Sequence, residues 1–212
     1  MTRTVILERA YEMYLARELI HGDERLSLVL DSLGYTTGAG YQIWPNQAAF
    51  RLDLQVYIAE RIDFASLEPL VDELQQIRDA DYPVEEHILR IAELYHDYFI
   101  GREEFYLVLR FFAMGGDRPP EVTEALRDSY VRQGWELDLA LQAAMERRNY
   151  RLRAGRSMEE LTTSITALVE GYALRHRVGP DAPLVEIGGQ TWQPFSAGLL
   201  SIIGCAIEPA DG

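Results

Sequence analysis

The sequence contains no lysine, so all 20 of its basic residues are arginines. They stand against 34 acidic residues, which gives a formal net charge of −14 at pH 7. Because basic residues drive most binding to phosphate groups, this balance argues against nucleic acids and anionic membranes as partners. A DNA-binding interpretation of the chain therefore needs specific evidence from its motifs.

Cysteine and long apolar runs are also scarce. The single cysteine, Cys205, excludes a disulfide framework within the monomer and is typical of a reducing compartment. We expect a buried, inert thiol there, because no histidine lies near it in the sequence. No segment reaches the ~18 uncharged apolar residues of a membrane span, and the N-terminus lacks a basic region followed by an apolar core. These features predict a cytoplasmic protein with no membrane partner.

Apolar residues recur at helical spacing along most of the chain, and no alternating strand pattern of useful length is present. This periodicity predicts an all-α fold. Glycines and prolines predict a loop over residues 178–190. The helices are expected over residues 4–16, 26–33, 37–44, from 47 onward, 67–78, 84–100, 103–114, 121–150, 158–172 and 191–207.

The most specific pattern lies in residues 3–50. A first helix precedes two short helices, which are separated by a tight turn at Gly34. The run Leu33-Gly34-Tyr35-Thr36-Thr37-Gly38, followed by Tyr41, Trp44 and Phe50, resembles the N-terminal DNA-binding domain of TetR-family transcriptional regulators. The resemblance implies a three-helix helix-turn-helix domain over residues 1–50. It also implies a larger helical effector-binding and dimerisation domain over residues 51–212.

In such a domain the second short helix enters the major groove of double-stranded DNA. The resemblance implies that Tyr41 faces phosphate, that Gln42 faces a base edge and that Trp44 anchors the helix to the core. The implied DNA-contacting residues are Thr36, Thr37, Gly38, Tyr41, Gln42 and Gln47.

Four residues depart from the pattern of the family. Gly40 stands where a bulky aliphatic residue is usual and Gln47 where lysine is usual, while Leu30 and Leu33 stand where alanines are expected. Residues 1–50 contain four arginines and six acidic residues, a net charge of −2. Three hypotheses therefore stay open. The chain is a regulator that binds DNA, a binding module of the same fold with weak or lost DNA binding, or a helical protein that merely mimics the apolar pattern.

The larger domain is expected to enclose a pocket for a small, largely apolar effector. We select candidate lining residues from its aromatic-rich helices, although for each residue taken alone plain core is the favoured interpretation. They are Tyr95, His96, Phe99, Phe112, Tyr130 and Trp135.

No catalytic constellation is present in the sequence, so we expect no enzyme activity and no cofactor. Glu93-x-x-His96 has the spacing of one half of a carboxylate-bridged di-iron site, but the sequence has no second Glu-x-x-His. A metal site is therefore not expected.

The last two predicted helices carry wide apolar faces, which favour a homodimer. A two-fold dimer would present two recognition helices to a near-palindromic operator, and an effector would release such a repressor from DNA. The expected interface residues are Leu161, Ile165, Leu168, Tyr172, Phe195, Leu199, Ile202 and Ile203.

Overall fold

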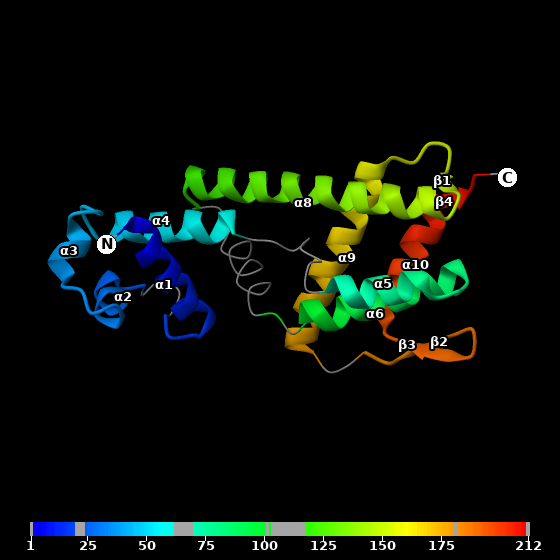
Figure 1. The fold of residues 1–212 in the computed structure, drawn as a ribbon, viewed down its shortest axis with the longest axis horizontal. Coiled ribbons are helices and arrows are strands. Elements are labelled where there is room, and N and C mark those ends of the chain that lie inside the picture. The colour runs from blue at the N-terminus through cyan, green and yellow to red at the C-terminus, as the bar shows by residue number, and fades with distance from the viewer. Residues whose placement is uncertain are drawn as a thin grey trace. The chain divides into compact units, whose positions relative to one another are not determined.

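The structure is a computed structural model, shown in Figure 1. It describes residues 2–19, 24–61, 70–100, 102, 118–179 and 182–210, apart from the side chain of Arg177. The chain divides into two compact units, Met1–Ile62 with Arg110–Tyr130 and Asp63–Leu109 with Val131–Gly212. The described part is mostly helical, as the apolar periodicity predicts. None of its helices combines the length and the apolar character that crossing a bilayer requires.

The first unit contains α1 (Arg3–Leu15), α2 (Leu26–Ser32), α3 (Thr37–Tyr41), α4 (Gln47–Glu60) and the first part of α8 (Pro120–Arg147). The helices α1, α2 and α4 begin within one residue of their predicted starts. Helix α3 ends three residues earlier than predicted. Pro45 disfavours a helical conformation at the residue before it, which accounts for an early end to α3.

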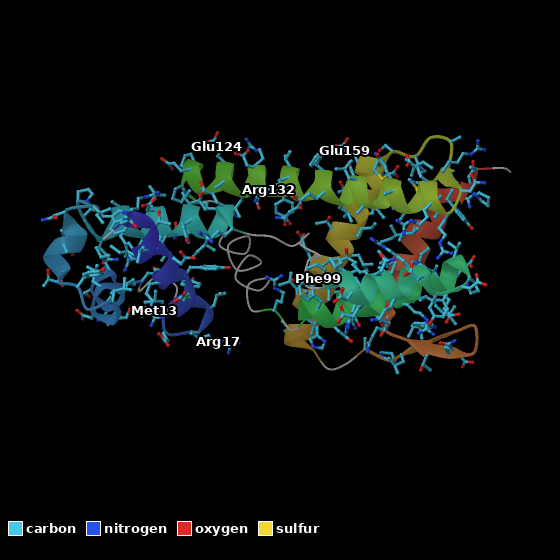
Figure 2. The ribbon with its side chains drawn as sticks, viewed as in Figure 1. Met13, Arg17, Phe99, Glu124, Arg132 and Glu159 are labelled. Atoms are coloured by element: carbon cyan, nitrogen blue, oxygen red, sulfur yellow. The ribbon has the colours of Figure 1, made fainter. Side chains whose placement is uncertain are left out.

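The core of this unit is formed by the apolar faces of α1, α2 and α4. Helix α1 contacts both α2 and α4, and α2 contacts α3. Met13, labelled in Figure 2, is one of the buried residues of α1. Asn46 caps α4 by accepting a 2.9 Å hydrogen bond from the backbone N–H of Ala49, so this helix start follows from the local sequence. The largest fully buried side chains include Ile6, Leu7, Leu26, Leu30, Phe50, Leu54 and Ile58.

The second unit contains α5 (Val71–Asp79), α6 (Val84–Ile100), the remainder of α8, α9 (Met158–Val178) and α10 (Pro194–Ala206). Helix α10 packs against both α6 and α9. The predicted helix over residues 103–114 lies outside the described residues, as does the beginning of the one over 67–78.

Two small antiparallel sheets accompany these helices, and the sequence pattern did not predict them. β1 (Tyr150–Leu152) pairs with β4 (Ile207–Pro209), and β2 (Val185–Ile187) pairs with β3 (Gln190–Trp192). The expectation of a loop up to residue 190 is therefore wrong for the β2–β3 hairpin. Gly188 and Gly189, with φ of +61° and +78°, make its two-residue turn. Since the hairpin extends to Trp192, α10 begins at Pro194 rather than at residue 191.

Cys205 corrects a second expectation, because its thiol is exposed rather than buried. The buried row of α10 runs through Phe195, Leu199 and Ala206. Cys205 is adjacent to Ala206 in sequence, and one residue turns a helix by about 100°. Its side chain therefore leaves the buried face.

Candidate functional site

Five of the six residues expected to contact DNA lie on α3 or directly next to one of its ends. Thr36, Thr37, Gly38, Tyr41 and Gln42 are all exposed, and 47% of the surface of Tyr41 is accessible. No side chain caps the N-terminus of α3, so the hydroxyl of Thr36 is not used there. The first unit therefore presents five of the six expected residues on its surface.

The turn between α2 and α3 is set by Gly34, which has a φ of +73°. Its backbone N–H bonds to the carbonyl of Asp31 at 3.1 Å, and the N–H of Tyr35 bonds to the carbonyl of Leu30 at 2.9 Å. A left-handed residue with these bonds is the usual way to end a helix, and glycine adopts it without strain. The tight turn that the sequence predicts at Gly34 is therefore confirmed.

Gly40 holds α3 close to α2. A Cβ atom at this residue would lie 2.5 Å from Cδ1 of Leu30 and 3.0 Å from Cδ2 of Leu26. Both leucines are buried, so their side chains have little room to move aside. The absence of a side chain at residue 40 lets the two helices approach, with the larger Leu30 filling the space.

Trp44 follows α3 and anchors this segment in the core, as expected. Its Nε1–H donates a 2.7 Å hydrogen bond to Oδ2 of Asp53, and its ring meets the ring of Phe50 edge-on at 5.2 Å. Arg3 also pairs with Asp53. Trp44 is 4% exposed, so its side chain fixes the end of α3 from within the core.

Gln47, the sixth residue expected to contact DNA, is committed to a structural contact. Its Oε1 accepts a 3.1 Å hydrogen bond from the backbone N–H of Leu26, and its Nε2 donates to the carbonyl oxygen of Glu24. It therefore satisfies a free N–H at the start of α2 from another helix. A long-range cap of this kind has no local sequence signal, which is why sequence reasoning missed it.

Several arginines of residues 2–61 are already paired with acidic side chains. Arg3 pairs with Asp53, Arg9 lies 3.1 Å from Glu12, and Arg51 lies 3.6 Å from Glu24. A paired arginine attracts phosphate less than a free one does. Helix α3 itself contains no charged residue, so it offers neutral hydrogen-bonding groups rather than positive charge.

Three of the six residues expected to line an effector pocket, Tyr95, His96 and Phe99, are packed within the second unit. The rings of Tyr95 and Phe99 stack at 5.5 Å. The ring of His96 lies 5.5 Å from that of Tyr172 and 5.9 Å from that of Phe195. Burial raises the pKa of Tyr95 well above its ordinary value. Within the described structure these side chains fill a core, as the alternative interpretation held.

The other three expected lining residues do not join this group. Phe112 lies outside the described residues, and Tyr130 belongs to the other unit. Trp135 on α8 exposes 63% of its surface, which is not the burial that a side chain enclosing a ligand would show.

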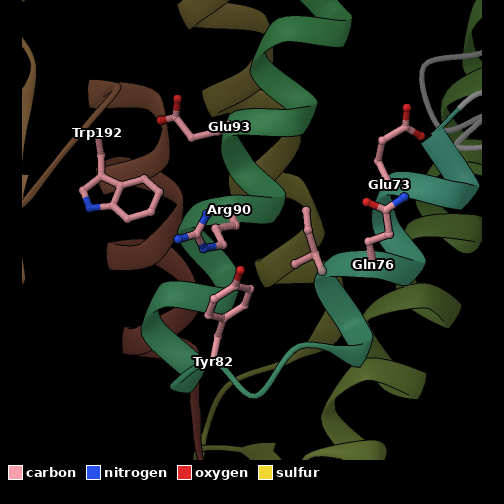
Figure 3. Close-up of a pocket in the computed structure, with 7 residues that line it drawn as sticks. Glu73, Gln76, Tyr82, Arg90, Glu93 and Trp192 are labelled. Atoms are coloured by element: carbon pink, nitrogen blue, oxygen red, sulfur yellow. The ribbon is translucent and has the colours of Figure 1, made fainter.

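A hollow of about 310 Å³ lies elsewhere in the second unit, between α5, α6 and β3 (Figure 3). We call it the α5–α6 pocket. Sequence reasoning missed it because its walls come from three separate segments. Its principal lining residues are Glu73, Ile77, Tyr82, Arg90, Glu93 and Trp192.

The expected dimer-interface residues fall into two groups. Leu161, Ile165, Phe195 and Leu199 are at most 7% exposed and form the core of the second unit. They have almost no surface left for a partner subunit, so the structure assigns them to the chain's own core. The residues that remain partly exposed beside this core are Leu168, Tyr172, Ile202 and Ile203.

Glu93 and His96 do not come together as metal ligands. Oε1 of Glu93 accepts hydrogen bonds from the backbone N–H of Gln193 at 2.8 Å and from Oγ of Ser196 at 2.6 Å. Nδ1 of His96 lies 3.0 Å from Oδ1 of Asp97. The described parts of the chain contain no group of three or more His, Cys, Asp or Glu residues able to hold a metal ion.

Comparison of the chain with models of protein families, with curated proteins and with solved structures found no match.

Proposed function

We propose that the protein is a homodimeric transcriptional repressor that binds DNA through α3 and is released by a small-molecule effector. The observation that carries the proposal is the pairing of two short helices around Gly40, with exposed side chains on Tyr41, the last residue of α3, and on Gln42, which follows it. A short helix held on a small core with free polar side chains suits the reading of base edges in a major groove.

The effector acts through differential binding. In one conformation of the dimer the two DNA-binding domains are wrongly spaced for the operator. A ligand that binds better to this conformation lowers operator affinity by the coupling free energy between the ligand site and the DNA site. The second unit, with its own core and the α5–α6 pocket, offers a place for such a ligand. The partly exposed apolar residues Leu168, Ile202 and Ile203 offer surface for the second subunit.

The proposal is tested by selecting genomic DNA fragments on the purified chain at low salt and by measuring affinities at increasing salt. We expect an enriched near-palindromic site whose affinity falls as salt rises. Tyr41→Ala and Gln42→Ala should each weaken binding by about tenfold, because a base or phosphate contact is lost. Gln142→Ala, the same change at an exposed residue of α8, is the matched control and should bind like the wild type.

A second candidate function is a binding module of the same architecture that does not contact DNA. The pairing of Arg3, Arg9 and Arg51 with acidic residues favours it, because these side chains are less available to phosphate. If no fragment is enriched above the non-specific background at any salt, the module becomes the better description. Thermal-shift screening of small molecules would then identify its ligand.

A further inference from the structure

The α5–α6 pocket combines aromatic and acidic walls. Trp192 and Tyr82 line it on one side, and Glu73 of α5 stands opposite (Figure 3). Trp192 is 6% exposed, and its Nε1–H donates a 3.2 Å hydrogen bond to the carbonyl of Ile187. This bond fixes the plane of the indole, so the pocket wall is preformed.

Arg90 lies in the middle of the pocket but is not a free cation. Its Nε and Nη2 both donate to Oε1 of Glu86, at 2.9 and 2.7 Å. Its guanidinium carbon lies 4.3 Å from the centre of the Tyr82 ring and 5.9 Å from the centre of the Trp192 ring. An ion pair on one side and an aromatic ring on the other hold this side chain in place. The Arg90–Glu86 pair is electrically neutral as a unit.

Two further carboxylates line the pocket without a basic partner. Glu73 makes no ion pair with any described residue, and its side chain is exposed to the pocket mouth. The described hydrogen bonds of Glu93 both use Oε1, with Gln193 and Ser196 as donors, so Oε2 is left for a ligand. With the Arg90–Glu86 pair neutral, the pocket carries about two negative charges.

From this arrangement we infer that the α5–α6 pocket binds a small organic cation, a protonated amine or quaternary ammonium with an apolar body. The carboxylates of Glu73 and Glu93, on opposite walls of the pocket, attract the positive group, and the apolar body lies against Ile77 and Trp192. The indole of Trp192 gives the apolar body of the ligand a large flat surface to pack against. The volume of about 310 Å³ suits a small ligand.

The role of the α5–α6 pocket as the effector site of a repressor rests on the proposed function. The effector is then a cation rather than the apolar molecule expected from the sequence. Cation binding itself needs no DNA. A failure to bind cations would leave the DNA selection result unchanged, and a failure to bind DNA would leave the cation titration unchanged.

The test is a titration of the full, ¹⁵N-labelled chain with benzylammonium, followed by NMR. The three tryptophans give three indole N–H signals, which are assigned by single Trp→Phe variants. We expect benzylammonium to shift the Trp192 signal while those of Trp44 and Trp135 stay in place. Benzyl alcohol and benzoate, of similar size but neutral and negative, should bind at least about tenfold more weakly. Binding of benzoate as tight as that of benzylammonium, or an unmoved Trp192 signal, overturns the assignment.

Charge-only variants then locate the positive group. Glu73→Gln and Glu93→Gln should each weaken benzylammonium binding by about three- to tenfold, the effect of one partly solvated charge pair. The amide oxygen of glutamine can still accept from Gln193 and Ser196, so the second variant keeps its structural bonds. Glu73 is exposed on α5, so the first variant tests the site without risk to the fold.

Glu85→Gln is the matched control for these variants. Its substitution changes the net charge by the same amount as the two pocket variants do. Glu85 is an exposed residue in the first turn of α6 and does not line the pocket. We expect it to bind benzylammonium like the wild type. Binding within twofold of wild type by both pocket variants, or an equal loss in Glu85→Gln, overturns the assignment.

Discussion

Gly40 and Leu30 pack so closely that a methyl group at residue 40 would lie 2.5 Å from Cδ1 of Leu30. In the sequence these residues stand out as two separate departures, one too small and one too large for the family that residues 3–50 resemble. In the structure they are a single compensated contact between α2 and α3. The space that a side chain at residue 40 would take is filled by the leucine.

The contact predicts that Gly40→Ala destabilises the first unit by up to about 2 kcal/mol, because overpacking costs about 1–3 kcal/mol and alanine regains only ~1 kcal/mol in helix propensity. Urea denaturation measures the change. Gly38→Ala is the matched control on the same helix, since no atom lies within 4 Å of its added Cβ, and it should be neutral or stabilising. In a Leu30→Ala background the penalty of Gly40→Ala should shrink, with only the contact to Leu26 remaining. An equal penalty in both backgrounds would contradict the compensation.

Gln47 predicts a stability effect where the sequence suggests a DNA contact. Gln47→Ala removes the bonds to the N–H of Leu26 and the carbonyl of Glu24, and we expect a loss of about 1–2 kcal/mol in the free energy of unfolding. Chemical denaturation gives the value. Gln142→Ala, which removes an exposed glutamine from α8, should change the free energy little. Unchanged stability in Gln47→Ala would show that the two bonds add nothing.

Asp53 serves two partners that differ in burial. Asp53→Ala leaves Nε1–H of the buried Trp44 without its acceptor, and we expect this to cost about 2 kcal/mol of unfolding free energy. Arg3→Ala removes only the more exposed partner of the same carboxylate and should cost about 0–1 kcal/mol. Thermal and urea denaturation of the two variants give the comparison. Equal losses would mean that the ion pair, rather than the indole bond, dominates.

Local signals account for what the sequence predicted well. Asn46 caps α4 through its own neighbour Ala49, and Gly34 ends α2 through bonds within one turn. The β2–β3 hairpin also had a local signal, since Gly188-Gly189 separates two short apolar-bearing segments. The two strands have three residues each, which is too short for an alternating pattern to be recognised. The Gly188-Gly189 turn therefore predicted a loop rather than a hairpin.

Other features depend on residues far apart in the chain. β1 pairs with β4 through Tyr150 and Pro209, which no window of periodicity can join. The α5–α6 pocket likewise brings Glu73, Arg90 and Trp192 together from three segments. A helical row of aromatic residues has the same spacing in a core as around a cavity. Tyr95 and Phe99 could therefore not be distinguished from pocket residues before their packing was known.

His87 predicts a pH dependence of stability in the second unit. Its Nδ1 lies 2.9 Å from Nη2 of Arg148, and arginine can only donate, so this imidazole nitrogen accepts. Burial, then the charges of Arg148 and Arg78, hold the pKa of His87 below its ordinary value of 6.5. Because the unfolded chain takes up this proton first as the pH falls, the contribution of His87 to stability is lost below about pH 6.5.

His87→Gln keeps an acceptor for Arg148 but cannot be protonated in this range. We expect its free energy of unfolding to fall less between pH 7 and pH 5 than that of the wild type, when both are measured by urea denaturation. An NMR titration of His87 in the folded chain should give a midpoint below 6.5. Equal pH slopes in the two proteins would mean that His87 has nearly the same pKa in the folded and in the unfolded chain.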